Sequence, residues 1–436
     1  MTLEEQLSSA GHARVLLVLK PQKNRRVDGR TALALDETIA LQQEAAHTLR
    51  PCFKEFRNSR TATLARELSA ARAARGVVFD FAPDPGIETV GDTDAIDYYP
   101  NLGVMLGTVD AAGLAALADN GKEVRAVMPA PDFTLIRPFE EDDAALAGPP
   151  PGESWALQRI KAPALWDKGF TGAGVTVGHL DTGVDKSHPA IKHAVDAFAH
   201  FDLTGKQVEK APAVDSKQHG THTAGIIAGK PFGGSTFGVA PGASLASALV
   251  IEGGDKPKRI FAGLNWCVGQ GVRIINISLG LTIFEASLSA VIRIVRQRGI
   301  LPVAAIGNEG FQTSRTPGNL PESLSVGATD ELDNIWFNSS SQLLPETPKR
   351  NVPSVIAPGA MIWSSVPGAG MKALSGTSMA APHITGLAAL LMEAKPDKTI
   401  DEIEKAIFAS CARPDHITTA RGNRGIPDGV AALEAL

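Results

Sequence analysis

The sequence predicts an α/β protein with a doubly wound, mostly parallel sheet and a smaller α/β domain in front of it. After residue 170, four apolar segments have the length of buried strands, and helical segments separate them. One helical segment carries its apolar residues at i, i+3, i+4 and i+7, namely Leu288, Val291, Ile292 and Val295. At 436 residues the chain exceeds the size at which single cores usually stop growing, so we expect two domains.

The four apolar segments define the expected sheet. They are residues 175–180, 244–251, 272–278 and 300–306. Strands that are apolar along their whole length are typical of parallel sheets with helices on both faces. Such sheets bind ligands beyond the carboxyl ends of their strands, and we therefore expect the functional site there.

The N-terminal part shows a β-α-β pattern at residues 102–129. Alternating apolar residues give way to helical spacing, the Asn120-Gly121 pair interrupts the helix, and a second apolar strand follows. We expect further strands at 13–20 and 76–82 and helices at 31–49 and 61–75. Together these elements predict a small α/β sandwich.

A change of composition separates the two domains. Between residues 138 and 155, acidic residues give way to alanine, glycine and three consecutive prolines, which is typical of an exposed linker. We therefore predict an N-terminal α/β domain at 1–137, a linker at 138–152 and a second domain at 153–436.

Composition limits the partners and the location. A net charge of −5 argues against nucleic acid or an anionic membrane as the main partner. The three cysteines have no disulfide or metal-ligand spacing. No signal peptide or transmembrane run is evident, so we expect a cytoplasmic protein, with leaderless export left open. The sequence gives no indication of the oligomeric state.

Four residues whose side chains can take part in catalysis lie at the expected ends of strands or at helix starts: Asp181, His219, Asn308 and Ser378. In acyl transfer a histidine takes the proton of a serine hydroxyl, a carboxylate orients that histidine, and an amide binds the oxyanion. We expect a helix to begin at Ser378 with Pro382 in its first turn, where a missing N–H is tolerated. Its positive end favours developing negative charge on the serine.

Each of the four residues also has a structural alternative. The acid can end a turn, the imidazole can lie in the core, the amide can belong to a turn, and the serine can cap a helix. For the other histidines we favour structural roles. His222 and His383 point away by helical offset, and we expect His179 to face the side of its strand opposite to Asp181.

The four motifs resemble those of the subtilisin-like serine proteases, the subtilases of peptidase family S8. They are "DTG", "HGTH", "GNEG" and "GTSMAAPH", in that order, within residues 155–391. The resemblance implies that Ser378 is the nucleophile and His219 the general base. It also implies that Asp181 is the orienting carboxylate and that Asn308 is the side-chain oxyanion donor.

Two extended segments resemble those between which subtilase substrates lie. The first comprises Ser278, Leu279 and Gly280, and the second comprises Ile251, Gly253 and Gly254. A peptide held there adds a strand by backbone hydrogen bonds. Glu309 favours basic residues near the specificity pocket, whereas Leu281, where glycine is common in the family, narrows it. No preferred residue follows from these two opposing features.

The resemblance also bears on metals. Many subtilases bind a structural calcium, but at the matching places this chain has Ala190 and Phe232, whose side chains carry no oxygen. We therefore expect this calcium site to be missing and no cofactor to be required.

The function implied is a serine endopeptidase that hydrolyses peptide bonds through an acyl-enzyme and is made as an autoinhibited zymogen. Residues 102–136 resemble the end of a subtilase prodomain of ferredoxin-like α/β type, with residues 131–136 in place of its inhibitory tail. Activation would follow cleavage between Ile136 and Glu153. Three alternatives stay open: a substrate-recruiting first domain, a catalytically silent peptide-binding protein, and an esterase.

Overall fold

The computed structural model describes residues 2–20, 35–54, 96–140, 148–251, 253–285, 288–345 and 349–436. These fall into two compact units, Met1–Ala130 and Pro131–Leu436. Two expected elements of the first domain, the helix at 61–75 and the strand at 76–82, lie outside the described residues. The domain limits expected at 137 and 152 stay predictions.

The first unit contains a four-stranded antiparallel sheet in the order β2-β3-β1-β4. The strands β3 and β4 with the helix α4 form the β-α-β unit that the sequence indicates, and β1 lies between the two strands. Apolar side chains of β1 such as Val15 and Leu17 are fully buried. Its elements are α1 (Leu3–Ala10), β1 (Ala13–Leu19), α2 (Leu35–Leu49), the 3-10 helix η1 (Arg50–Cys52), β2 (Ile96–Tyr99), β3 (Val104–Val109), α4 (Ala111–Asp119) and β4 (Val124–Pro129).

The second unit is built on an eight-stranded sheet in the order β10-β9-β12-β8-β13-β15-β16-β19. Only the edge pair of β10 and β9 is antiparallel, so the sheet is mostly parallel. The eight strands are β8 (Thr176–Asp181), β9 (Val195–Phe201), β10 (Gln207–Val208), β12 (Ser244–Leu249), β13 (Ile274–Ile277), β15 (Leu301–Ala305), β16 (Leu324–Thr329) and β19 (Val355–Pro358). The four expected strands are β12, β8, β13 and β15, which are neighbours at its centre.

Helices and short strands complete the second unit. The helices are α5 (Trp155–Arg159), α6 (Ala162–Trp166), α7 (His219–Ala228), α8 (Lys256–Gly269), α9 (Ser289–Gln297), α10 (Thr377–Ala394), α11 (Ile400–Ala409), α12 (Thr419–Gly422) and α13 (Gly429–Glu434). The other strands are β5 (Thr134–Leu135), β6 (Phe139–Glu140), β7 (Gly152–Glu153), β11 (Ser235–Thr236), β14 (Leu279–Gly280), β17 (Gln342–Leu344), β18 (Arg350–Val352), β20 (Ile362–Val366), β21 (Gly370–Ser375), β22 (Cys411–Ala412) and β23 (Ile426–Pro427).

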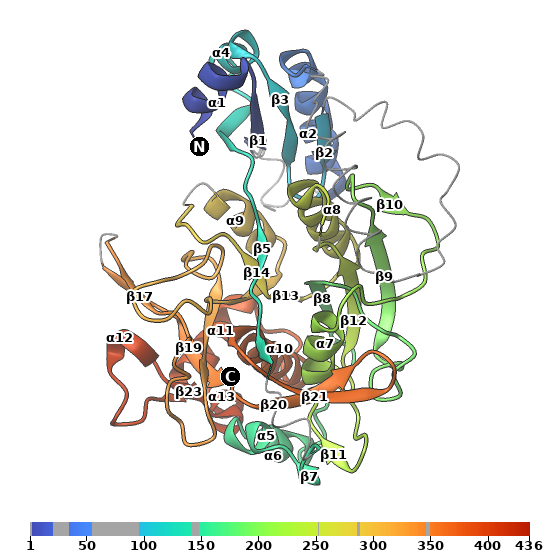
Figure 1. Cartoon of the computed structure of the whole chain (residues 1–436), viewed down its shortest axis with the longest axis vertical. Helices are drawn as coiled ribbons and strands as arrows, with labels where there is room; N and C mark the ends of the chain where they lie inside the picture. The colour runs from blue at the N-terminus through green and yellow to red at the C-terminus, as the bar shows by residue number, and fades with distance from the viewer. Residues whose placement is uncertain are drawn as a thin grey trace, which may run out of the picture. The chain divides into compact units, whose positions relative to one another are not determined.

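Helices cover both faces of this sheet (Figure 1). Leu180 and Ile277 face α8 and α9, with which they line a small apolar cavity. On the other face Asn276 accepts a hydrogen bond of 2.9 Å from Thr385 of α10. Both faces of the central strands are therefore buried, which explains why their sequences are apolar almost throughout.

The helix α10 begins earlier than expected. It starts at Thr377, so Pro382 is its sixth residue and not a member of its first turn. The expectation was wrong because the proline lies beyond the first four N–H groups, which lack helical partners in any case. The carbonyl of Ser378 consequently has no N–H at position 382 to accept from.

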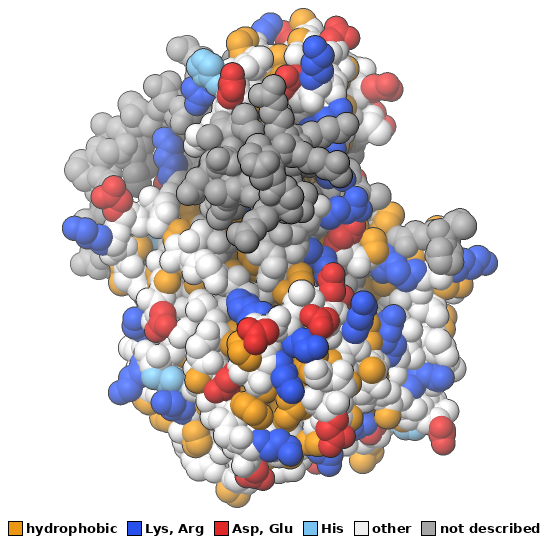
Figure 2. Space-filling view, turned by 180° about the vertical axis from the view of Figure 1, so that it is seen from behind, with side chains coloured by type: hydrophobic (Ala, Val, Ile, Leu, Met, Phe, Trp, Pro, Cys, Tyr) orange, Lys and Arg blue, Asp and Glu red, His pale blue; other side chains and the backbone are white. Residues whose placement is uncertain are grey.

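Three features of the described residues bear on membrane insertion, surface charge and disulfide bonds. None of the helices in the described part of the chain is long and apolar enough to cross a membrane. On the face drawn in Figure 2, positive and negative side chains of the described residues are interspersed. All three cysteines are free thiols.

Candidate active site

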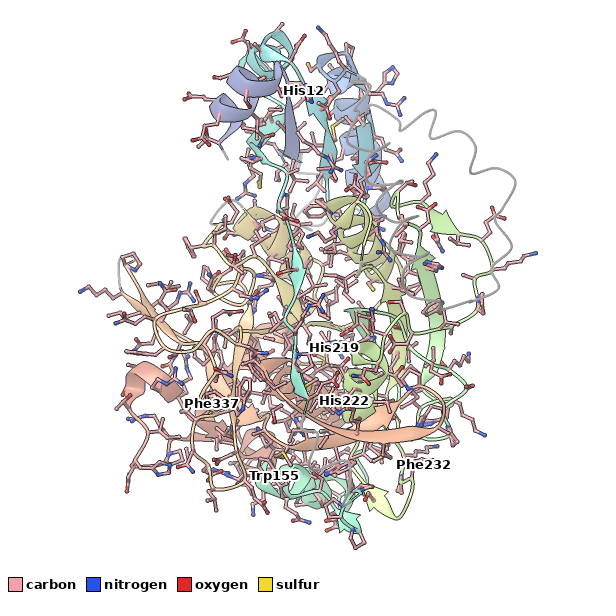
Figure 3. All side chains as sticks on the ribbon, in the orientation of Figure 1. His12, Trp155, His219, His222, Phe232 and Phe337 are labelled. Carbon is pink, nitrogen blue, oxygen red and sulfur yellow. The ribbon has the colours of Figure 1, made fainter. Side chains whose placement is uncertain are left out.

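Asp181 and His219 are brought together by two neighbouring elements. Asp181 is the last residue of β8, and His219 is the first residue of α7. The imidazole Nδ1 lies 2.7 Å from Asp181 Oδ1, and both side chains are buried. The backbone N–H of Thr182 donates to the same carboxylate oxygen at 2.7 Å. Figure 3 shows His219 on α7, together with His222.

Close backbone contact holds these two elements. A Cβ on Gly220 would lie 1.9 Å from the carbonyl oxygen of Gly183, so only glycine fits there. Asp215 links the end of β8 to the first turn of α7. Its carboxylate accepts from Thr182 Oγ1 at 2.7 Å and from Thr221 Oγ1 at 2.6 Å. The glycines of the "DTG" and "HGTH" motifs therefore set the approach of the acid to the histidine.

The Asp181 carboxyl is ionised in this setting. Burial alone would raise its pKa, but the neighbouring imidazole of His219, by charge and by hydrogen bond, brings the pKa below its usual value. The N–H of Thr182 acts in the same direction. A carboxylate at this position fixes the histidine with its proton on Nδ1.

Ser378 is the second residue of α10, at the positive end of the helix. Its hydroxyl donates a hydrogen bond of 2.8 Å to the carbonyl oxygen of Ile136. The helices α10 and α7 pack against each other, so the helices whose first turns carry the serine and the histidine are neighbours.

Asn308 follows β15 and uses both ends of its amide. Its Oδ1 accepts from the backbone N–H of Thr377 at 2.9 Å, and its Nδ2 donates to the carbonyl oxygen of Arg137 at 2.8 Å. A Cβ on Gly376 would lie 2.9 Å from Asn308 Nδ2, so a side chain at Gly376 would displace the amide. The amide donor thus faces a peptide carbonyl beside the serine.

A segment of the same unit, residues 131–140, lies across this site. Its strand β5 pairs antiparallel with β14, and the N–H of Ile136 donates to the carbonyl of Ser278 at 3.1 Å. Its strand β6 pairs with β21, where Phe139 lies opposite Ser375. Ser278, Leu279 and Gly280 therefore hold an extended peptide, and that peptide belongs to this chain (Figure 1).

The second expected substrate segment is placed at the start of α8. Ile251 is buried, and the Arg259 guanidinium donates to the carbonyl of Gly253 at 2.9 Å. A Cβ on Gly254 would lie 2.4 Å from the carbonyl oxygen of Leu203. The neighbours that the structure gives for Gly253 and Gly254 are thus Arg259 and Leu203.

Arg315 is a site residue that the sequence analysis missed. Its Nε donates to Glu309 Oε1 at 2.8 Å, and its Nη1 donates to Thr134 Oγ1 at 2.7 Å. The negative charge of Glu309 is therefore paired within the chain. Leu281, which was expected to narrow the pocket, is buried. No motif includes the arginine, and only its place six residues after Glu309 could have drawn attention to it.

Of the remaining histidines, His179 contradicts the sequence expectation. It does not face away from Asp181, because residues two apart in a strand share a face. Its Nε2 lies 3.7 Å from Asp181 Oδ2, and the ring is fully buried. His222 and His383 contact backbone carbonyls, of Ile362 and Lys372 in the first case and of Met379 in the second, which fits structural roles.

The two residues at the place expected for a subtilase calcium ion, Ala190 and Phe232, lie in apolar or aromatic contacts. Ala190 is buried, and the Phe232 ring packs against the His188 imidazole at a centroid distance of 4.9 Å. Neither side chain supplies the oxygen that a hard cation requires. Within the described residues, no group of three or more histidine, cysteine or acidic side chains could hold a metal.

Comparison with known proteins places the chain in a family. The model of the subtilase family, Peptidase_S8, matches residues 172–427. Subtilisin E of Bacillus subtilis is 36% identical over 251 residues, which is 56% of this chain and 62% of that protein. M-protease of Shouchella clausii is 34% identical over 262 residues, covering 59% and 64%, and a subtilisin of Bacillus pumilus is 35% identical over 251 residues, covering 56% and 86%.

The chain therefore belongs to the subtilase family, whose members are serine peptidases of α/β fold. It spans less than two thirds of the length of the first two of these relatives.

Proposed function

We propose that this chain is a serine endopeptidase in which Ser378, His219 and Asp181 form the catalytic triad and Asn308 supplies an oxyanion donor. The observation that carries the proposal is the 2.7 Å contact between His219 Nδ1 and Asp181 Oδ1. A second support is that the Ser378 hydroxyl donates to the backbone carbonyl of Ile136 in an extended peptide. The membership in the subtilase family supports it. Proteins and peptides are the proposed substrates.

The proposed reaction uses each group at one atom. His219 donates its Nδ1–H to Asp181, so Nε2 carries the lone pair that accepts the Ser378 proton. The serine oxygen then attacks the substrate carbonyl and forms the acyl-enzyme, and His219 returns the proton to the leaving amine. Asn308 Nδ2 donates to the oxyanion, and water hydrolyses the ester by the reverse sequence.

We also propose that the uncut chain is inhibited by its own residues 131–140. The support is that the Ser378 hydroxyl donates to Ile136, Asn308 donates to Arg137, and β5 occupies the strand position beside β14. A second peptide cannot pair with β14 until this segment leaves. Cleavage between Ile136 and Glu153 is the proposed activation, with the first unit acting in cis as a prodomain of ferredoxin-like type.

Labelling with a fluorophosphonate tests the first proposal, because this probe reacts with an activated serine. We expect labelling of the wild-type chain and none of Ser378→Ala, with stronger labelling after mild proteolysis of the linker. Equal labelling of both proteins after that proteolysis would refute the enzyme and favour a catalytically silent peptide-binding protein. Turnover of a small ester without turnover of casein would favour an esterase instead.

Two further expectations from the sequence remain proposals. We propose that the protein needs no cofactor and that calcium is not bound at the place occupied by Ala190 and Phe232. The cytoplasmic location also stays a prediction.

A further inference from the structure

A second imidazole lies directly behind the proposed catalytic carboxylate. His179 precedes Asp181 by two residues in β8 and is completely buried. Its Nδ1 lies 2.9 Å from Ser247 Oγ of β12, and its Nε2 lies 2.8 Å from Thr223 Oγ1 of α7. Both ring nitrogens are thus engaged, and the ring links three elements of the core.

Thr223 continues this contact to Asp181. Its Oγ1 lies 3.2 Å from Asp181 Oδ2 and also 3.2 Å from the carbonyl oxygens of His219 and Gly220. A threonine hydroxyl has one hydrogen to donate, so these three acceptors compete for it. The carboxylate is the charged acceptor, and hydrogen bonds to a charged acceptor are the stronger ones.

We propose that His179 is a positioning residue for Asp181 and acts through Thr223. The ring donates Nε2–H to Thr223 Oγ1, and the hydroxyl hydrogen of Thr223 is then directed to Asp181 Oδ2. The two carboxylate oxygens are held from opposite sides, Oδ1 by His219 and Oδ2 by Thr223. This inference rests on the proposed function, because it assumes that Asp181 orients His219 for catalysis.

The mechanism requires a neutral His179, whose Nδ1 accepts from Ser247. Burial lowers the pKa of this imidazole, while the charge of Asp181 opposes that effect and His219 adds to it. Asp215 is the other acid whose charge reaches the ring. The Cys267 thiol of α8 lies on the opposite face of the sheet, beside Gly178. It is neutral because burial raises its pKa to about 12.

When His179 is neutral, the charge of the Asp181 carboxylate stabilises only the imidazolium of His219. A cationic His179, 3.7 Å from Asp181 Oδ2, would compete with the His219 imidazolium that forms during the reaction. The same position therefore suits a hydrogen-bond donor without charge. Glutamine supplies such a donor, whereas valine supplies none.

The test compares His179→Val, His179→Gln and Thr223→Val, each made as the full-length chain and activated by mild proteolysis of the linker before the assay. We expect His179→Val to lower kcat about tenfold with KM changed less than twofold, since one hydrogen bond that acts on the triad is lost. His179→Gln should restore most of the rate. Thr223→Val should match His179→Val, and the double variant should show no further loss. His193→Gln, a histidine bonded to the carbonyl of Pro241, serves as the matched control.

The second readout is the downfield proton resonance of the His219 Nδ1–H. It should shift in His179→Val and Thr223→Val and keep its position in His179→Gln and His193→Gln. The acid limb of the pH dependence of kcat/KM should move in the same two variants. Wild-type kcat, resonance and pH profile in both valine variants would overturn the inference.

Failure of the proposed function would look different. In that case wild type would show no labelling that depends on Ser378, whatever the residue at 179. If His179→Val does not fold, Thr223→Val alone decides, because its side chain has nearly the same shape as threonine and lacks only the hydroxyl.

Discussion

Asn308, the proposed oxyanion donor, is held by hydrogen bonds at both ends of its side-chain amide. Its Oδ1 accepts from both the N–H and the hydroxyl of Thr377, at 2.9 Å each, and this leaves Nδ2 directed at the carbonyl of Arg137. Thr377 is the residue before the proposed nucleophile, so the donor and the nucleophile are held by the same helix start. The amide therefore needs no rearrangement when charge develops.

Replacement of Asn308 tests this arrangement. We expect Asn308→Ala to lower kcat about 10²- to 10³-fold with little change in KM, because loss of such a donor had this effect in a subtilisin. Asn334→Ala, which removes a surface amide bonded to Asp330, is the control. Steady-state kinetics on a chromogenic peptide, run after the linker has been cut, measure both. A kcat for Asn308→Ala within tenfold of wild type would contradict the assigned role.

At the residue scale, the motifs point to the candidate residues but not to the contacts that hold them. Asp181 and His219 were singled out by their neighbours in sequence, and the structure brings them to 2.7 Å. The roles of Thr377 and Arg315 depend on contacts between loops far apart in sequence, which no local pattern indicates. The expected orientation of His179 is wrong, because residues two apart in a strand share a face and its Nε2 lies 3.7 Å from Asp181 Oδ2.

At the scale of elements, buried side chains flank both ends of the short strand β5, which also pairs with β14. The phenyl ring of Phe133 is buried and meets the ring of Phe261 edge-on, with centroids 5.9 Å apart. A cavity of about 30 Å³ lies beside it, lined by Leu180, Leu264 and other apolar residues. Ile136 at the other end is completely buried. These anchors stabilise the covered state of the site.

Truncation of this anchor should therefore activate the uncut chain. Loss of a buried phenylalanine typically costs about 3–5 kcal/mol. The covered state loses that stabilisation and the open state does not, so we expect Phe133→Ala to raise fluorophosphonate labelling at least tenfold. Leu332→Ala, at a side chain that is 77% exposed, should leave labelling unchanged. Equal labelling of Phe133→Ala and wild type would argue against autoinhibition by this segment.

The elements differ in how well the sequence could indicate them. The central strands β8, β12, β13 and β15 were predicted because burial on both faces requires continuous apolar runs. The pairs β5–β14 and β6–β21 involve strands as short as two residues, which have no periodicity. They exist because two distant segments meet in the folded chain, and only the resemblance of residues 131–136 to an inhibitory tail pointed to one of them.

For the whole molecule, the calcium site that many subtilases use should make no contribution to stability. A ligand stabilises the folded state only by binding it, by an amount that grows with the ratio of its concentration to Kd. Because Ala190 and Phe232 offer no oxygen, we expect the same Tm in millimolar calcium and in excess EDTA. Differential scanning fluorimetry measures this. A Tm that rises with calcium concentration would show a site built from other groups.

Buried histidines should make the second unit sensitive to acid. Burial lowers the pKa of His222 to about 3 and that of His383 to about 4, against about 6.5 in the unfolded chain. Below pH 6.5 the unfolded state therefore binds more protons than the folded state. The free energy of unfolding then rises with pH, by about 1.4 kcal/mol per unit for each such histidine, between the folded and unfolded pKa values.

The variant His222→Gln isolates one of these contributions. Glutamine keeps an N–H for the carbonyls of Ile362 and Lys372 but does not titrate. Between pH 4 and 6 we expect its free energy of unfolding to depend less steeply on pH than that of wild type, by about 1.4 kcal/mol per unit. Tryptophan fluorescence during urea unfolding reports on this unit alone, because all five tryptophans lie after residue 130. His416→Gln, at an exposed histidine, should keep the wild-type slope. If His222→Gln also keeps that slope, the imidazole of His222 is not held neutral by burial, and its bonds to the two carbonyls do not couple folding of the unit to pH.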